Sequence, residues 1–196
     1  MIPITSALLA DLAPQGNSNV DRKAQQKTII DTAAPALQEQ CTKAGIDTML
    51  RAAHFLAQIC MESDGFCTAV EYASGAAYEG RRDLGNTQPG DGVRFKGRGL
   101  IMITGRANYA RYGHLLNLPL LETPALAADP VHAVAIAIEF WTAHGLNTFA
   151  DKDDIRSITR RINGGLNGLL ARQLYLTRAK RQLAPPAPSA PAAAIA

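Results

Sequence analysis

The stretch DTMLRAAHFLAQICMESDGF, residues Asp47–Phe66, decides the fold of this chain. Apolar residues cover most of the circumference of a helix drawn through it, which is typical of a helix at the centre of a core. Asp47 is a suitable N-cap, and Gly65 can adopt the left-handed conformation that ends a helix. We therefore expect a buried helix between these two residues, with the rest of the chain packed around it.

One polar stripe interrupts this helix. It consists of four residues at a helical spacing of three and four: Arg51, His54, Gln58 and Glu62. Glu62 falls in the last turn, where partial desolvation and the negative end of the helix dipole both favour its protonated form. A carboxyl group that holds a proton near neutral pH can act as a general acid. The alternative is a surface glutamate at a fraying helix end.

The overall composition indicates a single globular domain. The chain has 196 residues, of which 47% are hydrophobic and 19% charged, enough to bury a core. We expect one catalytic domain over residues 1–184 and a disordered, Pro/Ala-rich tail over residues 185–196. No apolar run approaches the ~18 residues that span a membrane, and the N-terminus lacks the basic segment of a signal peptide. We therefore expect a monomer, made in the cytoplasm, without stable membrane insertion.

The net charge of +3 is too small to indicate a partner, but its distribution is uneven. Residues 155–183 contain no Asp or Glu and seven basic residues: Arg156, Arg160, Arg161, Arg172, Arg178, Lys180 and Arg181. Such a region favours anionic surfaces, such as bacterial envelope polymers or nucleic acid. The alternative is a solvated basic face. Because no nucleic-acid recognition motif accompanies the charge, we expect no nucleic-acid partner.

Cysteines and histidines give no sign of a disulfide framework or a metal site. Three cysteines are too few for such a framework, and reduced thiols are expected in a reducing compartment, although Cys60 and Cys67 could pair. The four histidines, at positions 54, 114, 132 and 144, lack metal-ligand spacing, so we expect neither zinc nor another cofactor. His54 is interpreted as an internal histidine with a satisfied hydrogen bond.

Helical patterns surround one irregular region. Helices are expected over residues 3–12, 20–44, 106–117, 130–145, 155–162 and 167–183, and the second of them could be kinked or split at Pro35. Trp141 continues an apolar stripe and is expected in the core. Residues 75–99 hold seven glycines and no helical period, which is typical of a functional loop. Short strands could form at residues 93–95 and 100–103. The sequence therefore predicts a mainly α fold with a small irregular or β lobe.

A second carboxylate follows the helix stop. Glu71 lies nine residues after Glu62, on a different piece of backbone. Two acids on separate segments can face one cleft in different environments, which is what glycoside hydrolysis requires. One carboxylic acid protonates the leaving oxygen, and the other carboxylate activates water or attacks. Glu79 competes for the second role.

Four blocks occur in order along the chain: FLAQICMESDGF, EYASGAAYEGRRDLGN, FKGRGLIMITGRANYARYG and ITRRINGG. Together they resemble the family 19 glycoside hydrolases, above all the phage endolysin branch and related bacterial chitinase-like proteins. The resemblance covers residues 47–183. It implies a mainly helical, lysozyme-like fold with a cleft, and inverting cleavage of β-1,4 bonds next to N-acetylglucosamine.

The resemblance also implies roles for single residues. It makes Glu62 the general acid and Glu71 the second carboxylate, with Glu79 in reserve. The residues matching its water- and substrate-binding positions are Arg98, Thr104, Asn108, Tyr109 and Asn163, and Arg172 matches an arginine that reaches the acidic pair. Met102 and Asn167 depart from chitinase members, which carry glutamine and glutamate there.

We expect the glycan strands of peptidoglycan to be the substrate. The endolysin likeness, the cationic C-terminal region and the two departures from chitinases favour them over chitin. Such an enzyme is expected to be made in the host cytoplasm and to reach the cell wall through a separate membrane pore. A true chitinase is the alternative within the same class, and a wall-binding module without turnover is the alternative in another class.

Overall fold

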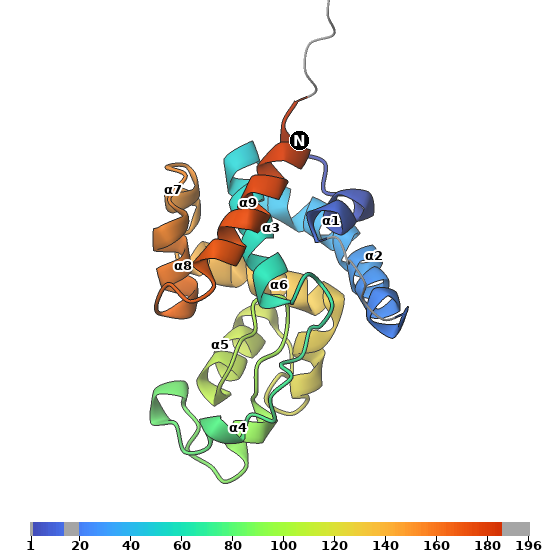
Figure 1. The fold of residues 1–196 in the computed structure, drawn as a ribbon. Helices are drawn as coiled ribbons and strands as arrows, with labels where there is room; N and C mark the ends of the chain where they lie inside the picture. The colour runs from blue at the N-terminus through green and yellow to red at the C-terminus, as the bar shows by residue number, and fades with distance from the viewer. Residues whose placement is uncertain (1, 14–19, 186–196) are drawn as a thin grey trace, which may run out of the picture.

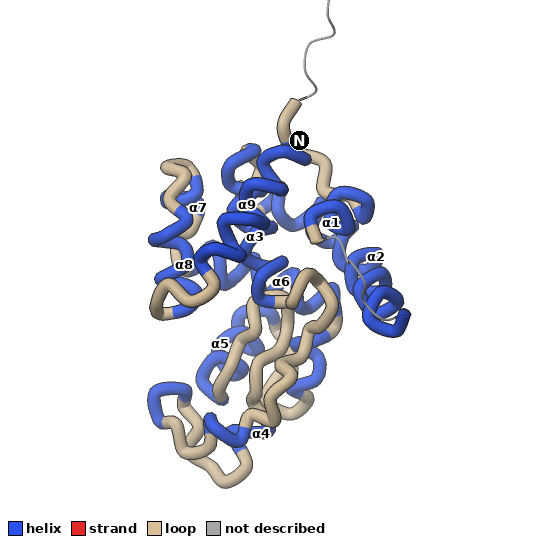
Figure 2. Tube along the Cα trace, in the orientation of Figure 1, coloured by secondary structure: helices blue, strands red, loops and turns tan. Residues whose placement is uncertain are grey.

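The computed structural model describes residues 2–13 and 20–185, and helices dominate it (Figures 1 and 2). The α-helices are α1 (Ser6–Leu12), α2 (Val20–Lys43), α3 (Met49–Glu62), α4 (Asp91–Arg94), α5 (Arg106–Leu116), α6 (Pro130–Ala143), α7 (Asn147–Ala150), α8 (Ile155–Asn163) and α9 (Leu169–Leu183), and the 3₁₀ helices are η1 (Ala76–Tyr78), η2 (Arg82–Leu84) and η3 (Pro124–Ala128). In this part of the chain, isolated β-bridges join Arg98 to Val70 and Ile103, and no strand forms. The predicted mainly α class is confirmed, and the lobe is irregular.

Helix α3 is the central element of the fold. Every residue from Ala52 to Cys60 is buried, and α9 packs along α3 more extensively than any other helix does (Figure 1). The expected N-cap at Asp47 is wrong by one residue, because the Thr48 hydroxyl accepts the Arg51 N–H at 3.3 Å. The expected stop at Gly65 is late by one residue: α3 ends at Glu62 with Ser63 as its C-cap, and Asp64, with φ +51°, is the first left-handed residue. Gly65 also has a positive φ of +67°, and its N–H donates to the Cys60 carbonyl at 2.7 Å.

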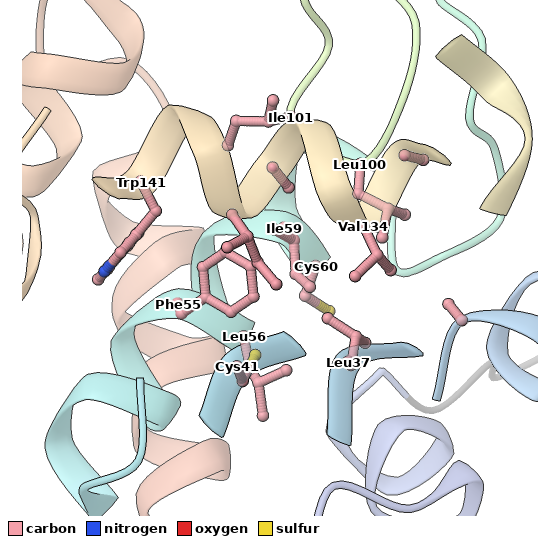
Figure 3. Close-up of a cluster of buried hydrophobic side chains, with 14 of the residues drawn as sticks. Leu37, Cys41, Phe55, Leu56, Ile59, Cys60, Leu100, Ile101, Val134 and Trp141 are labelled. Carbon is pink, nitrogen blue, oxygen red and sulfur yellow. The ribbon is translucent and has the colours of Figure 1, made fainter. Parts of the chain in front are cut away.

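Side chains from α2, α3 and α6 converge in the core beside residues 100 and 101 (Figure 3). Phe55 meets the ring of Trp141 edge to face, with centroids 5.3 Å apart, and the indole N–H donates to Asn147 at 2.8 Å. The predicted core position of Trp141 is confirmed. Cys41, Cys60 and Cys67 are free and buried, and burial raises the pKa of Cys41 to about 12.

The possible split of the second helix at Pro35 is wrong. Helix α2 continues through Pro35 as one helix of 24 residues. Proline removes one backbone hydrogen bond there, and the buried neighbours Ala33, Ala34 and Leu37 hold the helix against the core.

None of the helices in the described ranges is long and apolar enough to cross a membrane.

The irregular lobe lies between α3 and α5, around α4 (Figure 2). Its organising residue is Asp91, which is 1% exposed and accepts hydrogen bonds from the backbone of Thr87 and Gln88 and from the guanidinium of Arg106. The strand expected at residues 93–95 is wrong: residues 93 and 94 belong to α4, whose first residue is Asp91. Residues 100–103 form a turn closed by the bridge between Arg98 and Ile103.

Replacing Asp91 by asparagine tests how the lobe responds to acid. The hydrogen bond from Arg106 lowers the pKa of Asp91 from 3.8 to about 2. Because the folded pKa is depressed, the stabilisation is present above pH 3.8 and is lost as the pH falls towards 2. We expect Asp91→Asn to lower the free energy of unfolding by about 2 kcal/mol at pH 6, and to remove part of the stability loss between pH 4 and 2.

Urea unfolding monitored by circular dichroism at each pH measures both effects. Asp11→Asn, at an exposed position on α1, is the control and should follow the wild-type curve. A parallel loss of stability in wild type and Asp91→Asn below pH 4 would contradict the assignment.

Candidate active site

Two cavities, of about 460 and 440 Å³, share Glu62, Glu71 and Met102 in their walls. The first is also lined by Met61, Asp64, Thr68, Tyr72, Ala171 and Tyr175, and the second by Tyr78, Gly97, Ile101, Thr104, Ile162 and Asn163. Because they share these residues, they form one groove. One wall consists of α3, α8 and α9, and the other is the irregular lobe.

Glu62 is held by Arg172 of α9, 110 residues later in the chain. It is the last residue of α3, its side chain is 19% exposed, and its Oε1 accepts a hydrogen bond from Nη2 of Arg172 at 2.5 Å. Among the described residues, its Oε2 has no hydrogen-bond partner. Nη1 of Arg172 donates to Oε1 of Gln58, one turn earlier on α3. Arg172 therefore binds two residues of the polar stripe that lie one helical turn apart.

The rest of the polar stripe on α3 contacts the segment between α7 and α8. Arg51 donates two hydrogen bonds of 2.7 Å to Asp151. The buried His54 has its Nε2 2.7 Å from Asp153, which also binds Lys180 of α9. Burial lowers the pKa of His54. The hydrogen bond predicted for His54 is present on Nε2, and these contacts fix the start of α8 relative to α3.

Glu71 is held by the lobe. Its Oε1 accepts the hydroxyl of Tyr78 at 2.8 Å, and its Oε2 accepts the N–H of Gly97 at 2.9 Å. Its own N–H donates to the Gly97 carbonyl at 2.9 Å. Burial raises the pKa of Tyr78, and the bond to Glu71 raises it further, so the phenol keeps its proton and continues to donate. Sequence reasoning missed Tyr78, although it lies in the same quoted sequence block as Glu71, seven residues later.

Glu79 has a structural role instead. Its carboxylate accepts the N–H groups of Gly90 at 2.7 Å and Gly92 at 2.8 Å, and it lines neither cavity of the groove. It therefore ties the loop before α4 to η1. Of the two residues considered for the second carboxylate, the structure brings Glu71 into the groove with Glu62.

Thr104 and Asn163 lie in the second cavity, as the sequence predicted for a water- or substrate-binding position. The hydroxyl of Thr104 donates to the carbonyl of Met102 at 3.0 Å, so its oxygen remains available as an acceptor. A Cβ atom built on Gly97 would lie 3.1 Å from Oε2 of Glu71 and 3.4 Å from Oγ1 of Thr104. The carboxylate and the hydroxyl therefore flank the bare backbone of Gly97.

Three predicted substrate-binding residues lie outside the lining of both cavities. Tyr109 is 0% exposed, and its hydroxyl donates to the carbonyl of Lys96 at 2.7 Å, so the prediction of a sugar contact is wrong for it. Arg98 donates to the Tyr109 hydroxyl at 2.9 Å, and Asn108 donates to the Thr104 carbonyl at 2.8 Å. These side chains hold the loop that carries Thr104. A sequence motif does not distinguish such support from direct contact.

Gly97→Ala tests the close approach beside Glu71. The new methyl group would crowd Oε2 of Glu71 at 3.1 Å and take the space between it and Thr104. We expect a 10²-fold loss in kcat, because a displacement of about 1 Å at a reacting group has an effect of this order, with little change in Tm.

Gly165→Ala is the matched control, because a Cβ atom there meets nothing within 4 Å and Gly165 does not line the groove. Its turnover should stay within twofold of wild type. Equal turnover by both alanine variants would contradict the close packing around Glu71.

No family model matches the chain, but a related protein shows its family. A glycosyl hydrolase family 19 domain-containing protein of Haemophilus influenzae is 32% identical over 165 residues, which cover 68% of this chain and 80% of that protein. Two solved structures share the fold. Chitinase C of Streptomyces griseus has a TM-score of 0.70 at 21% identity and 93% coverage of both chains. The class IV chitinase of Zea mays has a TM-score of 0.65 at 23% identity, covering 94% of this chain and 95% of that one.

The architecture is the lysozyme-like, mainly helical one that the sequence predicted. The chain belongs to glycoside hydrolase family 19 and is a chitinase-like glycoside hydrolase.

Proposed function

We propose that Glu62 and Glu71 are the catalytic pair of an enzyme that hydrolyses β-1,4 bonds of bacterial peptidoglycan. One observation carries this proposal: the two carboxylates come from different backbone segments and line both cavities of the same groove. Their supports differ, since Glu62 contacts a buried guanidinium and Glu71 accepts a phenol and a backbone N–H. Different environments are what separate an acid from a base in glycoside hydrolysis.

Glu62 is assigned as the general acid. Its Oε2 is the oxygen that can deliver a proton to the leaving glycosidic oxygen, since Oε1 is used by Arg172. Met61 and Met102 line the cavity beside Glu62, so a glycan bound there would exclude water from the acid.

Glu71 is assigned as the general base. Both of its oxygens accept hydrogen bonds, which fixes the carboxylate at the edge of the second cavity beside Thr104. A water held by the Thr104 oxygen would give its proton to Glu71 as its oxygen bonds to the anomeric carbon. The bond from that carbon to the leaving oxygen breaks in the same step, and Glu62 protonates the leaving oxygen. Such a single displacement inverts the anomeric configuration and requires carboxyl groups ~6.5–9.5 Å apart.

Peptidoglycan is the proposed substrate on three grounds. Met102 lies in the wall of both cavities where chitinase members of the family carry a glutamine, and Asn167 replaces a glutamate at the exposed turn before α9. In addition, α8 exposes Arg156, Arg160 and Arg161, a cationic face suited to an anionic wall polymer. The basic cluster is smaller than the sequence suggests, because Arg172 is buried and Lys180 pairs with Asp153.

An endolysin role follows from this substrate. The enzyme would be made in a host cytoplasm and would degrade the wall after reaching it through a separate pore. The second candidate is a chitinase, which is supported by the fold shared with chitinase C and the class IV chitinase. The glycans of the two substrates share β-1,4-linked N-acetylglucosamine, so the groove chemistry is the same for both.

Glutamine substitutions separate catalysis from binding. Glu62→Gln keeps a hydrogen-bond acceptor for Arg172 but has no proton to deliver, and Glu71→Gln cannot take one. We expect each to slow the clearing of purified cell walls by 10²–10⁴-fold, with pelleting on walls and Tm close to wild type. Lysis at the wild-type rate by Glu62→Gln would contradict the catalytic assignment, whereas pelleting on walls without any lysis by the wild type would favour the wall-binding module.

The substrate is decided by the products. Wild-type protein should release muropeptides from peptidoglycan and leave colloidal chitin intact, with mass spectrometry identifying the reducing-end sugar and therefore the bond. Release of N-acetylglucosamine oligomers from chitin without any muropeptides would favour the chitinase. The Glu62→Gln protein, treated identically, is the control for contaminating hydrolases.

A further inference from the structure

We propose that Tyr72 is an aromatic platform that stacks against an N-acetylated hexose ring of the glycan, next to the scissile bond. This proposal rests on the proposed function of the groove. Tyr72 follows Glu71 directly in the chain, lines the first cavity, and is 71% exposed. Exposed aromatic rings with one fixed polar end are typical of surfaces that bind amphipathic ligands. Sequence reasoning assigned no role to this residue.

The phenol of Tyr72 is fixed from two directions. Its hydroxyl donates to Oδ2 of Asp64 at 2.9 Å and accepts from Nη1 of Arg22 at 3.2 Å. Arg22 also binds the same Asp64 oxygen at 2.6 Å, so the three side chains form a closed triangle. Burial and the bond to Asp64 both raise the pKa of Tyr72, so the phenol stays protonated. A ring that is already held loses little freedom when a sugar stacks on it.

The turn after α3 places the Asp64 carboxylate beside the Tyr72 hydroxyl. Asp64, Gly65 and Phe66 have φ values of +51°, +67° and +62°, three successive residues in the left-handed region. This conformation is costly for residues other than glycine and persists where surrounding contacts impose it. Helix α2 provides the contacts, because Gln26 donates to the Gly65 carbonyl at 2.7 Å and Arg22 binds Asp64. The turn that begins two residues after Glu62 therefore also sets the position of Tyr72.

The cavity beside Tyr72 has the composition of a sugar subsite. Its other walls include Met61, Met102, Ala171 and Tyr175, which are apolar or aromatic, while the two carboxylates lie at the boundary with the second cavity. A pyranose ring has an apolar face of C–H groups, and its N-acetyl group ends in a methyl group. One ring seated here would place its glycosidic oxygen near Glu62 and Glu71. The neighbouring sugar would then occupy the more polar second cavity.

Kinetics of three Tyr72 variants test the platform. On soluble peptidoglycan strands and on N-acetylglucosamine hexamer, we expect Tyr72→Ala to raise KM about tenfold with kcat within threefold of wild type, because a stacking contact contributes equally to substrate and transition state. Tyr72→Trp should restore KM to within threefold. Tyr72→Phe, which keeps the ring and loses the tether, should raise KM by about threefold.

The control is Leu115→Ala, which removes an exposed apolar side chain from α5, outside the groove. Its KM should equal that of wild type. An unchanged KM for Tyr72→Ala on a substrate that the wild type hydrolyses would overturn the platform while leaving the catalytic pair intact. A Tyr72→Ala protein that fails to fold would also overturn it, since an exposed ring should be dispensable for folding.

Direct binding separates this inference from the proposed function. If wild type hydrolyses neither substrate, the catalytic proposal fails, and calorimetry with the N-acetylglucosamine hexamer becomes the test. A Kd about tenfold weaker for Tyr72→Ala than for wild type would support the subsite on its own. Equal affinity of the two proteins, or no binding by either, would overturn it.

Discussion

A guanidinium buried between two helices is the interaction on which the rest of the structure depends. Arg172 of α9 is 1% exposed, and both of its partners, Gln58 and Glu62, lie on α3. A buried charge is tolerated only where it is paired and hydrogen-bonded. The packing of α9 on α3 and the orientation of the Glu62 carboxylate are therefore coupled. The contact that joins α9 to α3 therefore also positions the Glu62 carboxylate in the groove.

The opposite wall of the groove is built differently. Glu71 lies outside the short helices of the lobe, and side chains that bind backbone N–H groups fix the loops of this wall. Asp91 and Glu79 each accept two such bonds, and Glu71 accepts one from Gly97. A long loop becomes rigid when its free backbone donors find acceptors. The glycines allow these close approaches, as at Gly92, where an added Cβ would lie 2.5 Å from the backbone of Glu79.

The fold and the substrate are determined at different levels. This chain shares its fold with chitinases at 21–23% identity over more than 90% of its length. The residues that face a bound glycan are a small set on top of that scaffold, and they can change without altering it. We propose Met102 and Tyr72 as two such residues, since Met102 lines both cavities and Tyr72 lines the first. Substrate choice is therefore a question about the groove rather than about the helices.

The sequence by itself determined the features that depend on local interactions. The apolar circumference of α3 follows from residues within a few helical turns. The helix caps that the structure shows at Asp129 before α6 and at Asp154 before α8 are equally local. The sequence also identified Glu62 at a helix end and Glu71 shortly after it. Its four ordered blocks indicated the family.

Only the tertiary structure decided which side chains meet. Arg172 lies 110 residues from Glu62, and Arg51 lies 100 residues from Asp151, so no local pattern encodes these pairs. The choice of Glu71 over Glu79 and the burial of Tyr109 depend on how the aperiodic lobe folds back on itself. In that segment the backbone is fixed by hydrogen bonds between distant residues rather than by a repeating pattern, and such bonds exist only once the chain has folded.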